Sequence, residues 1–146
     1  MSDTKILNRQ IEAVQLGTYC TIIKDMLIQY RSLSIVKIAV FSFILKKQST
    51  LQIECYNAKN TTDLVLKALT QISGRQKEFL CQIPYILQAL DLLIKNNICD
   101  QHQGEIMCRL PSTASHQAIS GFLHNAILES HTFTDRQFLK EVISIV

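Results

Sequence analysis

Apolar side chains along this chain recur mostly at the spacing of an α-helix. From Ile83 the apolar positions continue through Ile86, Leu87, Leu90 and Leu93, a stripe on one helical face. The Asn96-Asn97 pair that follows predicts the end of this helix, since asparagine tolerates the left-handed conformation of a C-terminal cap. Pro84 lies inside the pattern and predicts a kink or a new helix start there. The spacing therefore predicts one long helix that ends close to residue 96.

A β-hairpin is predicted directly after this helix. A short β-like run at Ile98-Cys99 is followed by a polar turn that ends at Gly104, and residues 105–110 then alternate between polar and apolar before Pro111. A helix that leads straight into a hairpin is typical of the second half of a winged helix. The pattern predicts a mainly α, winged-helix-like single domain with one β-hairpin and additional C-terminal helices.

Further helices are expected on both sides of this unit. Residues 11–30 carry apolar positions at a helical period, whereas residues 35–45 are apolar almost all round and predict a helix at the centre of the domain, capped by Ser32 or Ser34. A buried strand is the alternative for residues 35–45, although their length favours a helix. Residues 51–56 alternate and predict a short extended segment.

Capping residues predict where the remaining helices begin. Thr61 or Thr62 is expected to cap a helix over residues 63–72, and Ser73 to Gln76 fits a capping box. Ser112-Thr113 is expected to cap a helix through about residue 128. Thr134 to Gln137 fits a second capping box before a last helix over residues 138–145. Residues 1–10 are expected to be a flexible lead-in, and residues 11–146 a single domain.

Size and charge narrow the class of protein. With 146 residues, 47% of them hydrophobic, the chain is long enough to bury a core. The net charge of +3 is mild and its Lys and Arg residues are scattered, which argues weakly against DNA binding by this chain alone. The longest apolar run, residues 35–45, is too short to span a bilayer. The first ten residues are polar and do not resemble a secretory signal, so a cytoplasmic location is expected.

No established catalytic motif occurs in the chain. Its five cysteines form no Cys-x-x-Cys pair, and we expect reduced thiols that mostly fill apolar space. His116 and His124 would share one face of the helix expected there, near Cys108, but zinc sites on helices usually use spacings of three or four. We therefore expect no enzyme activity, no metal and no cofactor.

Two groups of residues are candidates for contacts with partners. Lys46 and Lys47 follow the central apolar segment, where they either suit the helix dipole or contact nucleic acid. The expected hairpin tip carries two acids and no basic residue, which suits a protein partner better than a DNA groove. Apolar residues exceed what one small core needs, so an exposed patch for partner proteins is expected. Its candidate members are Tyr19, Phe122, Leu123, Phe133 and Phe138.

The order of these segments resembles a known family. A helix that opens with Thr18-Tyr19-Cys20-Thr21 is followed by apolar residues 38–45 with Lys46-Lys47, the helix 79–96, the hairpin 98–110 and a helical segment from Ala114. This order is similar to the small middle component of three-component ABC/SMC-type, Lamassu-like bacterial defence systems. Members of that family often have an Asn-Pro step just before this first helix. At the same place this chain has Gln15-Leu16-Gly17 instead.

The resemblance implies an architectural role without catalytic residues. It implies a non-enzymatic adaptor subunit that links an SMC-like ATPase to an effector nuclease in an antiphage or anti-plasmid complex, where DNA is bound mainly through the complex. The alternatives are a stand-alone winged-helix DNA-binding transcriptional regulator and another small helical accessory subunit. No membrane contact is expected in any of these cases.

Overall fold

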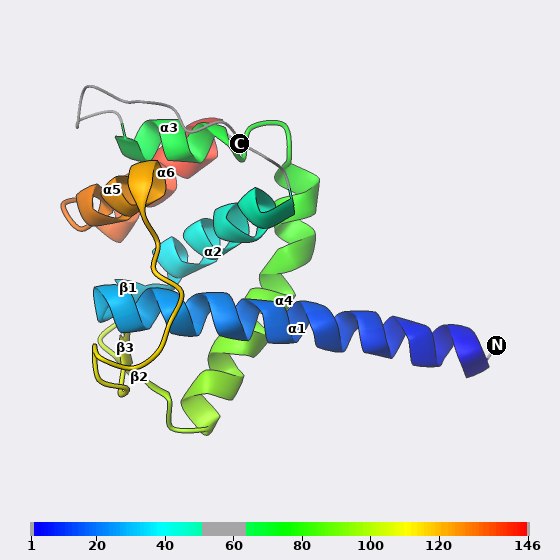
Figure 1. Ribbon diagram of the computed structural model, residues 1–146. Helices are drawn as coiled ribbons and strands as arrows, with labels where there is room; N and C mark the ends of the chain where they lie inside the picture. The colour runs from blue at the N-terminus through cyan, green and yellow to red at the C-terminus, as the bar shows by residue number, and fades with distance from the viewer. Residues whose placement is uncertain (1, 51–63, 146) are drawn as a thin grey trace.

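The part of the chain that the structure describes is mainly helical, with one small antiparallel sheet (Figure 1). The computed structural model describes residues 2–50 and 64–145. In chain order the elements are α1 (Ser2–Tyr30), β1 (Ser32–Ser34), α2 (Ile35–Thr50), α3 (Leu64–Thr70), α4 (Gln76–Lys95), β2 (Cys99–His102), β3 (Glu105–Cys108), α5 (Gly121–Ser130) and α6 (Asp135–Ile145). The predicted fold class, mainly α with a β-hairpin and further C-terminal helices, is confirmed.

The apolar helix α2 lies at the centre of the domain, as its composition predicts. One side of α2 meets α1 and α4, and α3, α5 and α6 gather at the other (Figure 1). Phe41 and Phe43 are both fully buried and point to these two groups, because Phe41 packs on Phe138 of α6 and Phe43 packs edge-on against Phe79 of α4. The ring centroids of these pairs lie 5.7 and 5.2 Å apart, within the range of favourable aromatic contacts. The core is therefore continuous through α2.

The hairpin is joined by a third strand that the pattern did not predict. The strand order is β1-β3-β2, both pairs are antiparallel, and Leu33 of β1 lies opposite Ile106 of β3. Both turn residues, Gln103 and Gly104, have positive φ angles of 51° and 80°, as a tight hairpin turn requires. The turn is shorter than predicted, since β2 extends to His102. The sheet ties the end of α1 to the segment after α4.

Several predicted helix boundaries are confirmed by their caps. Asn97 has a φ of 62° just beyond α4, the left-handed conformation expected of it. The backbone N–H of Lys37 donates to Ser34 Oγ at 3.4 Å, so Ser34 does cap α2. Thr134 and Gln137 form the predicted reciprocal capping box, with hydrogen bonds of 3.0 and 3.2 Å.

Other boundaries differ from the prediction. The first helix begins at Ser2 rather than near residue 11, since no Gly or Pro interrupts residues 2–16. The N-cap of α4 is Arg75, without a side-chain hydrogen bond, so the capping box at Ser73 is wrong. Pro84 lies within α4 and does not start a new helix. The extended segment predicted at residues 51–56 and the caps at Thr61 and Thr62 lie outside the described residues.

The helix predicted over residues 114–128 is wrong in its first part. Residues 111–120 form a loop, and α5 begins only at Gly121. Gly121 has a φ of 72°, which a right-handed helix running through this position would not allow. The loop is instead held by α1, because the side chain of Gln29 exchanges two hydrogen bonds with the backbone of Ile119, at 2.7 and 2.9 Å. Tertiary contacts therefore override the local helical pattern here.

Candidate interaction surfaces

Most of the predicted partner patch is part of the core. Tyr19 and Phe138 are fully buried, Leu123 is nearly so, and Phe122 and Phe133 are half-buried against the same core. The expectation of one exposed patch built from these five residues is therefore wrong. The physical reason is that a small domain uses its largest apolar side chains first to fill the space between its helices.

Tyr19 belongs to a polar junction where three helices meet. Its hydroxyl donates to Gln82 Oε1 of α4 at 2.8 Å, and Lys46 Nζ of α2 donates to the same oxygen at 2.8 Å. Lys46 Nζ also lies 4.8 Å from the centre of the Tyr19 ring, a cation–π contact. Burial raises the pKa of Tyr19 and, together with the neighbouring Lys47, lowers the pKa of Lys46. This junction joins two predicted site residues in a structural role.

Lys47 has partners within the fold as well. Its ammonium group pairs with Glu78 of α4 and lies 5.8 Å from the centre of the Phe43 ring. Partial burial, with a smaller contribution from Arg75, lowers its pKa. Contact of Lys46 and Lys47 with nucleic acid stays a prediction, and such contact would compete with these internal contacts.

The hairpin carries less net negative charge than the sequence of its tip suggests, because one of its two acids is paired. Arg109, just beyond β3, holds Asp100 through two hydrogen bonds of 2.5 and 2.7 Å. The hydrogen bond from Arg109 lowers the pKa of Asp100, so this carboxylate stays charged and paired. Cys99 lies opposite Cys108 at the base of the hairpin, both buried as free thiols.

His116 and His124 do not lie on one helix, so they do not share the helical face that was predicted for them. His116 lies in the loop before α5, with Nδ1 2.8 Å from the carbonyl oxygen of Ala114, whereas His124 lies on α5. His124 Nδ1 contacts the Tyr30 hydroxyl at 2.8 Å and the Gln29 amide at 3.2 Å. Within residues 2–50 and 64–145, no group of three or more His, Cys, Asp or Glu residues is placed to hold a metal ion.

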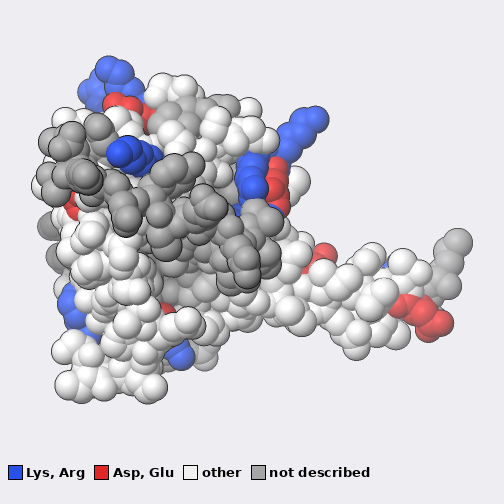
Figure 2. All heavy atoms as spheres, turned by 45° about the horizontal axis from the view of Figure 1, so that its top comes forward, with Lys and Arg blue, Asp and Glu red and all other residues white. Residues whose placement is uncertain are grey.

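The most prominent exposed surface is the N-terminal part of α1, which the sequence interpretation treated as a lead-in. Residues 3–14, here called the arm, are exposed throughout and project away from the body of the domain (Figures 1 and 2). The arm carries four large apolar side chains with exposed fractions between 48% and 69%. They are Ile6 at 55%, Leu7 at 55%, Ile11 at 48% and Val14 at 69%. Apolar groups held away from the body are typical of an interface.

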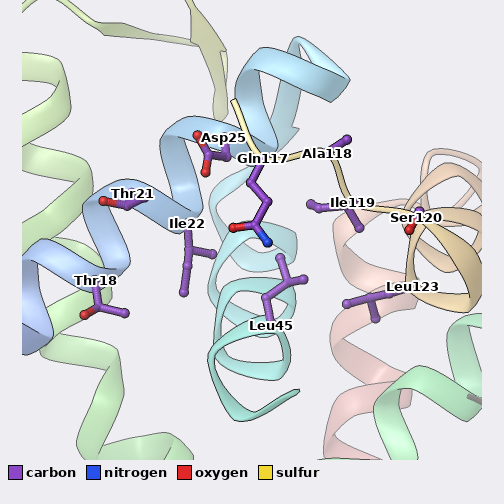
Figure 3. A pocket seen from close by; sticks show the side chains of 10 residues that line it. All are labelled: Thr18, Thr21, Ile22, Asp25, Leu45, Gln117, Ala118, Ile119, Ser120 and Leu123. Carbon is purple, nitrogen blue, oxygen red and sulfur yellow. The ribbon is translucent and has the colours of Figure 1, made fainter. Parts of the chain in front are cut away.

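A groove lies beside α1 where the arm joins the body. It has a volume of about 590 Å³ and lies between α1, the end of α2, the loop 117–120 and α5 (Figure 3). Its lining residues are Thr18, Thr21, Ile22, Asp25, Leu45, Gln117, Ala118, Ile119, Ser120 and Leu123. Thr18 and Thr21 donate to backbone carbonyl groups of α1 itself, at 2.8 and 3.1 Å, and Asp25 is the charged residue of the lining.

A second exposed apolar face lies on α4. Leu80 and Leu87 are 55% and 47% exposed, and Pro84 between them is exposed too. Their spacing of four and three residues places them on one side of the helix, which we call the outer face of α4. Gln82 and Ala89 contact α1 from the opposite side of α4. The predicted helical stripe included Leu87, which the structure places outside the core.

No helix in the described ranges is both long and apolar enough to cross a lipid bilayer. Comparison of the chain with protein-family models, with curated proteins and with solved structures finds no match.

Proposed function

We propose that this chain is a non-enzymatic adaptor that binds partner proteins. The observation that carries the proposal is the outer face of α4, where Leu80, Pro84 and Leu87 form an exposed apolar stripe. In a winged-helix arrangement the helix before the hairpin is the one that nucleic-acid binders place against DNA. An apolar stripe on this helix suits a protein surface instead.

The charges around this face support a protein partner over DNA. On this side of α4, Lys95 is paired with Asp91 at 2.7 Å, and Lys77, one turn before Leu80, adds a single further positive charge. The face therefore offers little net positive charge to phosphate groups, the main source of affinity in DNA complexes. The alternative, a stand-alone DNA-binding regulator, requires a basic surface that these residues do not supply.

The resemblance of the segment order to small components of Lamassu-like systems supports the identity of the partners. We infer that the outer face of α4 docks on the head of an SMC-like ATPase, and that another surface of the chain binds the effector nuclease. DNA is then contacted mainly through the assembled complex. An apolar stripe of this kind fits a hydrophobic patch or groove on the ATPase head.

The proposal is tested by co-purification of the tagged chain with the products of the genes beside its own, among which we expect an SMC-like ATPase and an effector. Leu80→Glu and Leu87→Glu are expected to release the ATPase and to leave the circular dichroism spectrum unchanged. Leu128→Glu is the matched control, because Leu128 on α5 is 46% exposed and lies on a different helix. Retention of the ATPase by both α4 variants would contradict the proposed face.

A second assay separates the adaptor from the regulator. We expect weak DNA binding by the isolated chain, without sequence preference, measured by fluorescence anisotropy at physiological salt. Sub-micromolar, sequence-selective binding would refute the adaptor and favour the regulator.

A further inference from the structure

The exposed side of α1 carries a seam with the spacing of a coiled coil. Along it the residues follow one another at alternating intervals of three and four, and they are Thr4, Leu7, Ile11, Val14, Thr18 and Thr21. None of these side chains is charged. The first four belong to the arm, and the last two line the groove together with Ile22 and Asp25 of the same helix (Figure 3). The seam and the groove are thus one continuous surface.

We propose that two copies of this chain pair through this seam, with their α1 helices antiparallel. One register brings every seam residue opposite another seam residue. Ile11 then meets Val14 of the second copy, Leu7 meets Thr18, and Thr4 meets Thr21, each twice by symmetry. The centre of the pair is formed entirely by aliphatic side chains, and the outer layers contain methyl groups of threonine.

The charges beside the seam fit the same register. In an antiparallel pair, flanking residues on one side of the seam meet their equivalents on the other helix. Asp3 lies beside Lys24 of the second copy in this register, and neither side chain has an ion pair within residues 2–50 and 64–145. Asn8 meets Gln15 on the other flank. Such pairs contribute more to register and orientation than to affinity.

The shape of the molecule leaves room for this pairing. The arm projects from one side of the body (Figure 2), so two antiparallel helices place the two bodies at opposite ends. The arm of each copy then lies along the groove of the other. Leu7 of the second copy reaches the level of Thr18, where Leu45, Ile119 and Leu123 supply an apolar lining.

The paired segment runs from Thr4 to Thr21, about 27 Å of helix at roughly 1.5 Å per residue. Arm against arm alone would pair only residues 3–14, whereas a standard interface buries roughly 800 Å² per partner. The groove adds contact area from α2, the loop 117–120 and α5. Use of the groove therefore favours the longer register over pairing of the arms alone.

The first test is the mass of the purified full chain by sedimentation velocity, over concentrations up to roughly 200 µM. We expect a dimer whose dissociation constant rises at least about tenfold with Leu7→Glu. Ile6→Glu is the matched control, because Ile6 is equally exposed at 55% but lies beside the seam rather than on it. A monomer at every concentration, or equal effects of the two variants, would overturn the proposal.

The second test exchanges the flanking charges and does not depend on the core of the seam. Lys24→Asp alone and Asp3→Lys alone should each weaken the dimer, and the double variant should restore it. If neither single variant changes the dissociation constant of the dimer, the antiparallel register is refuted. Leu80→Glu and Leu87→Glu on α4 should leave the dimer intact, so loss of the ATPase and loss of the dimer are distinguishable.

Discussion

Replacement of Gln29 by methionine should release the loop before α5. The side chain of Gln29 accepts a hydrogen bond from the backbone N–H of Ile119 at 2.7 Å and donates to its carbonyl oxygen at 2.9 Å. Its amide also lies 3.2 Å from Nδ1 of His124. Methionine is close in volume, so Gln29→Met removes the polar contacts and largely keeps the packing.

The magnitude follows from the two hydrogen bonds to Ile119. Each contributes about 1 kcal/mol net, so the free energy of unfolding should fall by about 2 kcal/mol. The contact with His124 adds little at its longer distance. For a chain of this size, this loss lowers the melting temperature by roughly 4 to 8 °C.

Urea unfolding followed by circular dichroism gives the free energy, and hydrogen exchange at the Ile119 amide reports the loop directly. Gln117→Met is the control, because Gln117 belongs to the same loop and is exposed. A change below about 0.5 kcal/mol, with unchanged exchange at Ile119, would refute the argument that Gln29 holds the loop.

Three further outcomes are expected. Phe138→Ala should cost about 3–5 kcal/mol in urea unfolding, since Phe138 is fully buried, whereas Leu139→Ala on the exposed side of α6 should cost far less. At pH 8 a thiol reagent should label exposed Cys81 in the folded chain and reach Cys99 only on unfolding, as peptide mass mapping would show; rapid labelling of Cys99 would contradict its burial. Burial raises the pKa of Cys99 from 9.0 to about 12. Its contribution to stability is therefore complete below pH 9 and lost as the pH rises toward 12, so Cys99→Ala should flatten the alkaline part of a urea-midpoint profile.

Local patterns predicted the elements that depend on local interactions. The helix α4, its end at Asn97, the hairpin turn at Gly104 and the capping box at Thr134 all rest on residues close in sequence. Strand β1 was not predicted, because its three residues become a strand only through pairing with β3. The loop 111–120 was missed for a similar reason, since the side chain that holds it comes from α1.

Exposure was harder to predict than secondary structure. A surplus of apolar residues correctly indicated exposed apolar surface, but it did not identify which residues form it. Tyr19 and Phe138 are core residues, while the large apolar side chains that are exposed are non-aromatic, and many of them lie on the arm and on α4. The spacing of Leu7, Ile11 and Val14 was a signal for the arm, because it extends the helical period toward the N-terminus.

The long separation in sequence between α1 and the segments it packs against constrains how the protein folds during synthesis. α1 packs most extensively against α4, and Tyr19 and Gln82 are 63 residues apart, while Gln29 and Ile119 are 90 apart. At about 5–20 residues per second, a ribosome needs roughly 3 to 13 s to make the residues between Tyr19 and Gln82. During that interval the apolar side of α1 lacks its main partner, and it is a natural target for chaperones. Emergence of α4 from the ribosome, rather than of α1, should therefore mark the point at which the nascent chain becomes resistant to proteolysis.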